Sequence, residues 1–341
     1  MKWFVRCDSL SLGMSQPTES SESFADRAAL RELMQEVSSL PSALACAEGA
    51  GALLQSHRQD ATPPLLALCW QAGRTARQAY PQSEPIAAAW ARTLCLLTTA
   101  YGSSDLLPET FRCQEEREAV AAQFPDSEGV QYWNAQSNFE MVTVLAQRGY
   151  VKSIPIYLDN LRTLSRAWRS RAPFPALYAM ALANAAAAYA QLQEAPTARE
   201  QVDDLRELAQ QHPGSAEVQQ AYARGLQQLA WYCGELVTPR VLHGWAMELA
   251  ELLESSSIRR ECGSRAVAEL GVYAAYFARR DELTLAADAL RQACRWFEAV
   301  TLDPEVLPMI VETFRGAAKT LRSTDPALAA LAETRTERLL V

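Results

Sequence analysis

The stretch that decides the fold spans residues 179–213 and contains, from Ala181 onward, the segment ALANAAAAYAQLQEAPTAREQVDDLRELAQQHP. Its alanine-rich first half favours a helix, because alanine is the best helix former and lets neighbouring helices approach closely. After a short polar turn, apolar residues from Ala198 to Ala209 recur at helical spacing on one face. The stretch therefore predicts two antiparallel helices joined by a short turn.

Looser copies of this helical hairpin occur around Gly149, Gly234 and Asp281, about 40–47 residues apart, which is the range of helical-hairpin arrays. Hydrophobic residues make up 49% of the 341-residue chain and glycine is scarce, so an all-α fold with a large core is predicted. Proline positions and the 3.6-residue period predict about fifteen helices. Their expected ranges are 24–38, 41–56, 63–79, 84–101, 107–123, 127–148, 151–171, 174–192, 196–212, 215–233, 238–255, 258–279, 281–301, 304–322 and 326–339.

Residues 179–213 resemble a tetratricopeptide repeat. The positions that match its pattern are Leu182, Ala185, Ala186, Tyr189, Ala198, Val202 and Pro213. Weaker matches run through Leu145, Gly149, Ile154 and Leu158, and through Leu270, Gly271 and Ala286, whereas the unit near residue 220 places Pro239 close to the small-residue position. The resemblance covers residues 127–300, and the first 126 residues share only the hairpin character. It implies a tetratricopeptide-like α-α hairpin solenoid, a right-handed superhelix whose concave face binds an extended segment or a helix of a partner protein.

The resemblance also implies which side chains line that concave face. They are Gln136, Phe139, Thr143, Gln147, Met180, Ala187 and Gln191, with Arg224, Gln228 and Tyr232 from a weaker third unit. This lining is rich in amide and apolar groups and poor in charge. It suits hydrogen bonding to an extended backbone together with one or two apolar anchors.

Three arginines, Arg162, Arg166 and Arg169, share one face of the helix expected over 151–171. Like charges on one helix face repel unless an anionic group lies nearby. Besides an ordinary solvated face, two explanations stay open: acidic residues of the next helix, with Glu194 and Glu200 as candidates, or an acidic partner protein. Under the second explanation, replacing Arg162 and Arg166 by glutamate weakens partner binding and leaves the thermal midpoint almost unchanged.

Composition limits the partners and the compartment. The formal charge of −8 argues against bulk nucleic-acid binding, which needs a basic surface. No apolar run reaches the ~20 residues of a membrane span, and the N-terminus lacks the apolar core of a signal peptide. Eight scattered cysteines are expected to be reduced and buried. With arginine largely replacing lysine, which suggests a GC-rich genome, we expect a bacterial cytoplasmic protein. Residues 1–23 are expected to be a disordered tail, and residues 24–341 a single helical-repeat domain.

Catalytic patterns are weak. The histidines His57, His212 and His243 are far apart and lack metal-ligand spacing. The sequence DDLRE from Asp203 to Glu207 is similar to the Mg²⁺-binding carboxylates of all-α terpene synthases, but no second carboxylate motif accompanies it, so a solvated charged face is favoured. Eight tryptophans would also fit an (α/α) toroid glycosidase, but the short linkers favour core positions. We predict no catalytic residue, metal site or cofactor, and hence no enzyme.

The leading hypothesis is therefore a non-catalytic protein–protein interaction scaffold or adaptor that binds a partner peptide or helix in its concave groove. One alternative is a regulatory protein that senses a peptide or a small ligand, and another is an all-α enzyme with an unrecognised site. An open groove favours the adaptor, whereas an enclosed pocket of carboxylates favours the enzyme. The sequence leaves the partner, the pathway and the oligomeric state open.

Overall fold

The computed structural model describes residues 21–57 and 61–339, and this part of the chain is all-α, without a strand. The predicted all-α class is therefore confirmed, whereas the tetratricopeptide-like solenoid stays a prediction. The chain forms two compact units, Met1–Trp133 and Asn134–Val341. Most of the predicted tail, residues 1–20, lies outside the described residues, and the first helix begins at Ser21, inside that predicted tail. That residues 24–341 act as one domain stays a prediction.

The helices follow the predicted order. The first unit contains α1 (Ser21–Gln35), α2 (Leu40–Ser56), α3 (Pro63–Ala79), α4 (Glu84–Ser103), α5 (Leu107–Gln123) and the start of α6 (Glu128–Arg148). The second unit contains the rest of α6, η1 (Val151–Ser153), α7 (Ile154–Ala167), α8 (Pro173–Gln191), α9 (Ala195–Gln211), α10 (Ala216–Cys233), η2 (Gly234–Leu236), α11 (Pro239–Leu252), α12 (Ser256–Arg279), α13 (Leu283–Phe297), α14 (Leu307–Leu321) and α15 (Pro326–Glu337). Each of the fifteen predicted helices has a counterpart.

The helix predicted over 151–171 is shorter than expected. It begins as a 3-10 turn, and α7 ends at Ala167. The amide of Trp168 closes the last turn on Leu164, and the Trp168 ring stacks on Phe174 with ring centroids 5.4 Å apart. Because Pro173 already starts the next helix, the four predicted residues 168–171 form the turn instead. The predicted face of three arginines is therefore wrong at its end, since Arg169 lies in the turn beyond α7.

The first helix of four hairpins ends in the same left-handed turn. The residue with positive φ is Asp105 (62°), Gly149 (74°), Gln193 (62°) and Asp281 (63°). The next amide donates to the carbonyl five residues earlier: Leu106 to Tyr101, Tyr150 to Leu145, Glu194 to Tyr189 and Glu282 to Phe277, at 2.9–3.0 Å. This Schellman turn satisfies terminal carbonyls and reverses the chain. Asp105, Gly149 and Gln193 are 44 residues apart, and Asp281 follows after two such intervals. α10 differs, because it continues into η2 and Val237 is extended.

The N-caps of the second helices keep the same interval. They are Thr62, Leu106, Tyr150, Glu194, Thr238 and Glu282, each 44 residues after the last. Ser39, Ser83 and Ser215, which cap first helices, follow it too. The predicted interval of about 40–47 residues is thus refined to 44. A tetratricopeptide unit has about 34 residues, so these hairpins are about ten residues longer.

The 44-residue interval also corrects the register of the weaker predicted matches. The pair Ala185–Ala186 aligns with Leu229–Ala230 and Tyr273–Ala274, so Leu270–Gly271 lies three residues too early. The small-residue position of Ala198 is taken by Leu242 and Ala286, and all three are buried. Pro239 is the first residue of α11, three residues before that position.

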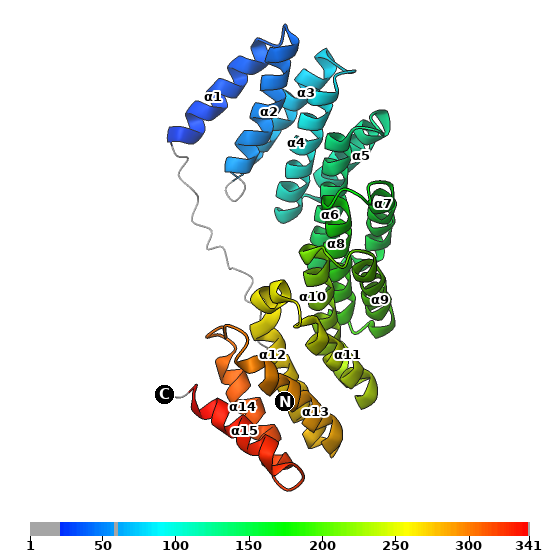
Figure 1. The fold of residues 1–341 in the computed structure, drawn as a ribbon. Coiled ribbons are helices and arrows are strands. Elements are labelled where there is room, and N and C mark those ends of the chain that lie inside the picture. Colours follow the sequence, from blue (N-terminus) through cyan, green and yellow to red (C-terminus); the bar gives the residue numbers. More distant parts are fainter. Residues whose placement is uncertain (1–20, 58–60, 340–341) are drawn as a thin grey trace. The chain divides into compact units, whose positions relative to one another are not determined.

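Within each unit, helices pack in chain order (Figure 1). A first helix contacts its own second helix and the first helix of the next hairpin. In the second unit, α8 packs on α9 and α10, α10 on α11 and α12, and α12 on α13 and α14. In the first unit, α2 packs on α3 and α4 in the same way. The described helices therefore show the neighbour-to-neighbour packing of a helical repeat.

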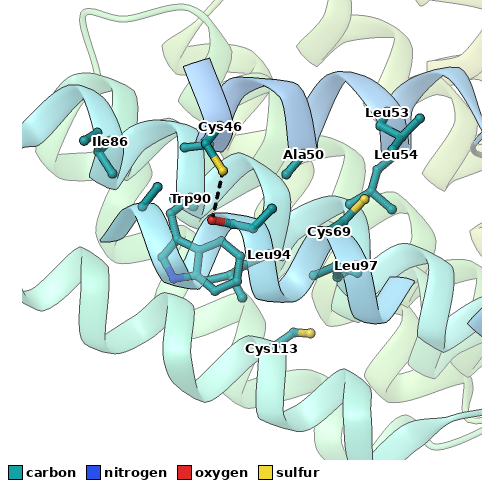
Figure 2. Close-up of a cluster of buried hydrophobic side chains, with 14 of the residues drawn as sticks. Cys46, Ala50, Leu53, Leu54, Cys69, Ile86, Trp90, Leu94, Leu97 and Cys113 are labelled. Atoms are coloured by element: carbon teal, nitrogen blue, oxygen red, sulfur yellow. Dashed lines mark hydrogen bonds between the residues drawn. The ribbon is translucent and has the colours of Figure 1, made fainter. Parts of the chain in front are cut away.

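The core of the first unit surrounds Trp90, which is fully buried on α4 (Figure 2). The Trp90 ring meets Trp70 edge to face, with centroids 5.4 Å apart, and its Nε1 donates to Glu116 Oε1 at 3.2 Å. It also lies directly against the backbone of Gly73 on α3, where an added Cβ would be 2.2 Å from the ring. The large indole thus fits only because residue 73 has no side chain.

The described cysteines lie in these cores, as expected. Cys46, Cys69, Cys95, Cys113, Cys233, Cys262 and Cys294 are all buried. Cys46 Sγ donates to the Ala72 carbonyl at 3.5 Å, as the dashed line in Figure 2 shows. Burial raises the pKa of Cys46 to about 11 and those of Cys69 and Cys294 to about 12, so these thiols stay protonated. Cys7 lies outside the described residues.

One first-helix position holds a small residue in every hairpin but one. Thr93, Ser137, Ala181 and Gly225 occupy it at 44-residue intervals, and all are buried. In α12 the same position is Glu269, which is 1% exposed. Its Oε1 accepts a hydrogen bond from Arg265 Nε at 3.2 Å, while Oε2 has no partner among the described residues. Burial raises the pKa of Glu269 to about 7, although Arg265 opposes the shift.

Gly73→Ala is expected to destabilise the protein by about 1–3 kcal/mol, because the added methyl group displaces the Trp90 ring. Gly49→Ala is the matched control in the same unit, since its Cβ would make only ordinary contacts at 3.5 Å. Alanine there should stabilise α2 by about 0.5–1 kcal/mol. Urea unfolding followed by circular dichroism measures both variants. An equal effect of the two substitutions would contradict the close packing at Gly73.

Glu269→Gln is expected to stabilise the protein at pH 8 and to change its stability little at pH 4. The unfolded carboxyl titrates near pH ~4.3. Between that pH and about 7 the unfolded chain ionises while the folded protein keeps its proton. Protonated Glu269 contributes its full share to the free energy of unfolding below pH ~4.3, and this contribution is lost as pH rises through about 7. The loss amounts to roughly 3 kcal/mol. Urea unfolding from pH 4 to pH 8 measures this slope, with the exposed Glu312→Gln as control. Identical slopes in wild type and Glu269→Gln would show that Glu269 is ionised in the folded protein.

Candidate functional site

The predicted lining residues form rows across α6, α8 and α10. Gln136, Met180 and Arg224 occupy the same position in three successive hairpins, 44 residues apart. The other rows are Glu140, Asn184 and Gln228; Thr143, Ala187 and Trp231; and Gln147, Gln191 and Glu235. The described side chains of all four rows are half-buried or exposed. We call the surface formed by these four rows, together with the neighbouring Tyr232, the amide face.

A depression of about 180 Å³ lies on the amide face between α6 and α8. Its lining residues are Thr143, Ala146, Gln147, Asn184, Ala187, Ala188 and Gln191. Asn184 Nδ2 donates to Thr143 Oγ1 at 2.9 Å, which ties the two helices together. The structure thus brings four predicted residues, Thr143, Gln147, Ala187 and Gln191, into one depression. Asn184 was missed, although it shares the helix face of Ala187 and Gln191 within an alanine-rich run.

The amide face has an apolar edge at the ends of α8 and α10. Tyr232 and Trp231 are exposed, and Gln191 Nε2 lies 3.5 Å from the Tyr232 hydroxyl. Leu192 and Leu236, 44 residues apart, are about half exposed. Trp231 and the two leucines were not predicted, although the 44-residue interval places them beside predicted residues. Phe139 is only half-buried, whereas the matching Ala183 and Gln227 are buried, so Phe139 stands outside the rows.

Arg162 belongs to a second surface and is already paired within the protein. Its Nε donates to the Tyr178 hydroxyl at 2.8 Å and its Nη2 to Asp204 Oδ2 at 2.7 Å. Asp159 Oδ1 lies 3.5 Å from its Nη1. The anionic partner on the next helix is therefore Asp204 rather than the predicted Glu194 or Glu200. Glu194 precedes α9 as its N-cap, whereas Asp204 lies a full two turns inside that helix.

The same arrangement recurs 44 residues later. Arg206 Nε donates to the Tyr222 hydroxyl at 2.9 Å, and Nε and Nη2 bind the two oxygens of Glu248 at 2.7 and 2.9 Å. The Tyr222 hydroxyl also donates to Glu248. Burial alone would raise the pKa of Glu248, but hydrogen bonds from Arg206 and Tyr222 hold that pKa below its ordinary value. We call each trio, Arg162–Tyr178–Asp204 and Arg206–Tyr222–Glu248, an arginine latch.

A cavity of about 340 Å³ lies beside the first latch, between α7, α8 and α9. We call it the arginine pocket. Its lining residues are Arg162, Ser165, Arg166, Arg169, Tyr178, Asp204, Glu207, Leu208, Gln211 and His212. Arg166 and Arg169 are exposed and make no hydrogen bond or ion pair within residues 21–57 and 61–339. The structure therefore brings the three predicted arginines together but separates their roles.

The other charged candidates are engaged in the structure or stand apart. Asp203 and Asp204 of the DDLRE segment bind Arg206 and Arg162. His57 Nε2 lies 3.9 Å from Asp26 and His243 Nε2 lies 3.6 Å from Asp288. Across the part of the chain that the structure describes, no group of three or more His, Cys, Asp or Glu side chains could hold a metal ion.

Comparison with known proteins adds no relative: no protein-family description matches the chain, and no curated protein matches it significantly. Among the described helices, none is both long and apolar enough to span a bilayer.

The two latches and the free arginine predict three different stability effects. Arg206→Gln should cost about 1.5–3 kcal/mol, because the half-buried carboxylate of Glu248 loses its charged hydrogen bonds. Arg162→Gln should cost about 1 kcal/mol, since the Arg162 side chain is 39% exposed. Arg166→Gln should change stability by less than about 0.5 kcal/mol. Chemical denaturation measures all three, and equal losses would contradict the latches.

These latches also correct the expected behaviour of a variant with glutamate at 162 and 166. Glutamate at position 162 would face Asp204 and lower the thermal midpoint, so that variant cannot separate binding from stability. Arg166 and Arg169 are the arginines whose replacement tests binding.

Proposed function

We propose that the protein is a non-catalytic scaffold or adaptor whose amide face binds an extended segment of a partner protein. In this proposal the hairpins form a tetratricopeptide-like solenoid, a right-handed superhelix with α6, α8 and α10 on its concave side. The observation that carries the proposal is the set of rows on these three helices. They present amide groups at a regular interval, together with three charged residues, Glu140, Arg224 and Glu235.

The chemistry of the amide face suits a polypeptide backbone. An extended segment exposes one N–H and one C=O group per residue, and each glutamine or asparagine side chain can both donate and accept. Gln147, Asn184 and Gln191 surround an alanine floor between α6 and α8. Trp231 and Tyr232 add exposed aromatic surface for an apolar anchor residue.

The size of the depression favours a segment over an enclosed small ligand. Small-molecule pockets usually hold about 300–1,000 Å³, and the depression on the amide face holds about 180 Å³. That volume accommodates one side chain of a segment that continues across α8 and α10. We also propose that the partner carries an acidic residue opposite Arg224, which is the exposed cation of the first row, and that the protein works in a bacterial cytoplasm.

Peptide selection tests the proposal. Peptides selected from a random 12-residue display library should bind the wild-type protein, and Gln147→Ala with Gln191→Ala should weaken binding about tenfold or more. The estimate assumes about 1 kcal/mol for each lost hydrogen bond. Gln210→Ala on α9, which is exposed and remote from these rows, is the matched control. Fluorescence anisotropy gives the affinities.

A photo-cross-linking residue locates the bound peptide independently. Placed at Ala187, it should capture the selected peptide, and placed at Gln210 it should not. Selected peptides that bind Gln147→Ala with Gln191→Ala as tightly as wild type, and that cross-link from position 210, would refute the amide face as the binding surface.

A further inference from the structure

The arginine pocket lies between the first latch and the ends of α7 and α9, and its residues are distinct from those of the amide face. We propose that this pocket binds a free acidic α-amino acid, a zwitterion with two carboxylates and one ammonium group. The proposal stands independently of the scaffold function.

The charges that remain after pairing within the protein define this ligand. Arg162 and Asp204 neutralise each other in the latch. Arg166 and Arg169 then remain on the α7 side, and Glu207 remains on the α9 side. Two guanidinium groups match two carboxylates, because the guanidinium fork binds carboxylate oxygens in pairs. One carboxylate matches an ammonium group.

The helix ends favour a zwitterion over a simple dianion. α7 ends at Ala167 and α9 ends at Gln211, next to residues that line the pocket. The carbonyls at a helix C-terminus carry about half a negative charge, which stabilises cations and repels anions. A phosphate or a dicarboxylate would have only the arginines to offset this field, whereas an ammonium group beside Glu207 and the α9 terminus is favoured by it.

The interface of the second latch, formed by α9, α10 and α11, shows that a latch does not require the residues of the arginine pocket. There Glu248, one methylene longer than Asp204, reaches both Arg206 and Tyr222. At the positions that match Arg166, Arg169 and Glu207, that interface has Gln210, Pro213 and Glu251. The arginine pair is therefore a property of the first interface alone, and latch formation does not explain it. The volume of about 340 Å³ lies within the range for small-molecule sites.

Isothermal titration calorimetry of the full chain with L-glutamate, L-aspartate, glutarate, succinate and inorganic phosphate tests the proposal. We expect one of the two amino acids to bind more tightly than the matching dicarboxylate and more tightly than phosphate. Arg166→Gln with Arg169→Gln should weaken that binding at least tenfold. Glu207→Gln should weaken binding of the amino acid at least fivefold and should not weaken binding of the dicarboxylate. Arg240→Gln with Arg260→Gln, which removes two exposed arginines on α11 and α12, is the charge-matched control.

Asp204→Glu is an independent variant that keeps every charge. It should reproduce the Glu248 latch, raise the thermal midpoint or leave it unchanged, and weaken ligand binding by filling the pocket. Thermal unfolding of each variant without ligand checks that the fold is intact. The proposal is overturned if neither amino acid binds at millimolar concentration, or if the control variant loses as much affinity as Arg166→Gln with Arg169→Gln. It is also overturned if Glu207→Gln weakens the dicarboxylate and the amino acid equally.

Discussion

In four hairpins the left-handed turn that ends the first helix is the constraint that sets where the second helix begins. At Asp105, Gln193 and Asp281 a residue with a side chain takes a backbone conformation that costs roughly 1–2 kcal/mol outside glycine. The hydrogen bond across the turn offsets this cost and fixes the residue at which the second helix begins. Four residues after each N-cap, one side chain enters the core. These residues are Leu66, Thr110, Ile154, Ala198, Leu242 and Ala286, and all are buried.

The two helices of a hairpin are linked by different polar contacts in the two units. An aromatic side chain on a first helix and an acid 26 residues later, on the second helix of the same hairpin, recur in three places: Trp90 with Glu116, Tyr178 with Asp204, and Tyr222 with Glu248. Trp90 and Tyr222 donate to their acids, whereas the Tyr178 hydroxyl accepts from Arg162, which also donates to Asp204. In the second unit an arginine joins each pair, because a carboxylate at a half-buried interface needs a nearby cation as well as a neutral donor. In the first unit, Trp90 Nε1 donates to one oxygen of Glu116 at 3.2 Å.

The sequence is sufficient to predict what depends on local chemistry. Alanine content, proline positions and helical spacing predict the all-α class and the helices, because each of these signals acts within a few residues. The tetratricopeptide resemblance adds much of the amide face, since its register places Gln147 and Gln191 there. The left-handed residues carry weaker signals: aspartate and glutamine are common in many settings, so only their shared 44-residue interval marks Asp105, Gln193 and Asp281 as turns.

What the sequence could not show depends on contacts between helices. Trp168 ends α7 by stacking on Phe174, which removes Arg169 from the predicted helix face. The partner of Arg162 is Asp204, because the angular position of a residue on α9, not its distance along the chain, decides which acid faces α7. The sequence around Glu269 has the same helical spacing of apolar residues as the sequence around an exposed glutamate, so it gives no sign that Glu269 is buried. Only the neighbouring hairpins reveal that its position is buried, as Thr93, Ser137, Ala181 and Gly225 are.

The acids of the two latches, Asp204 and Glu248, differ in length by one methylene group. Glu248 is long enough to meet both nitrogens of Arg206 and the hydroxyl of Tyr222, so the second interface is closed by charged hydrogen bonds. Asp204 reaches Arg162 with one oxygen, and the space that a longer side chain would fill belongs to a cavity lined by two further arginines. Because the latch holds the helices in either case, the residues around it are free to differ without loss of the fold. Because the turns recur at 44-residue intervals, substitutions can change the chemistry of one interface without altering the others. At the first latch interface, such differences leave Arg166, Arg169 and Glu207 exposed to solvent beside the arginine pocket.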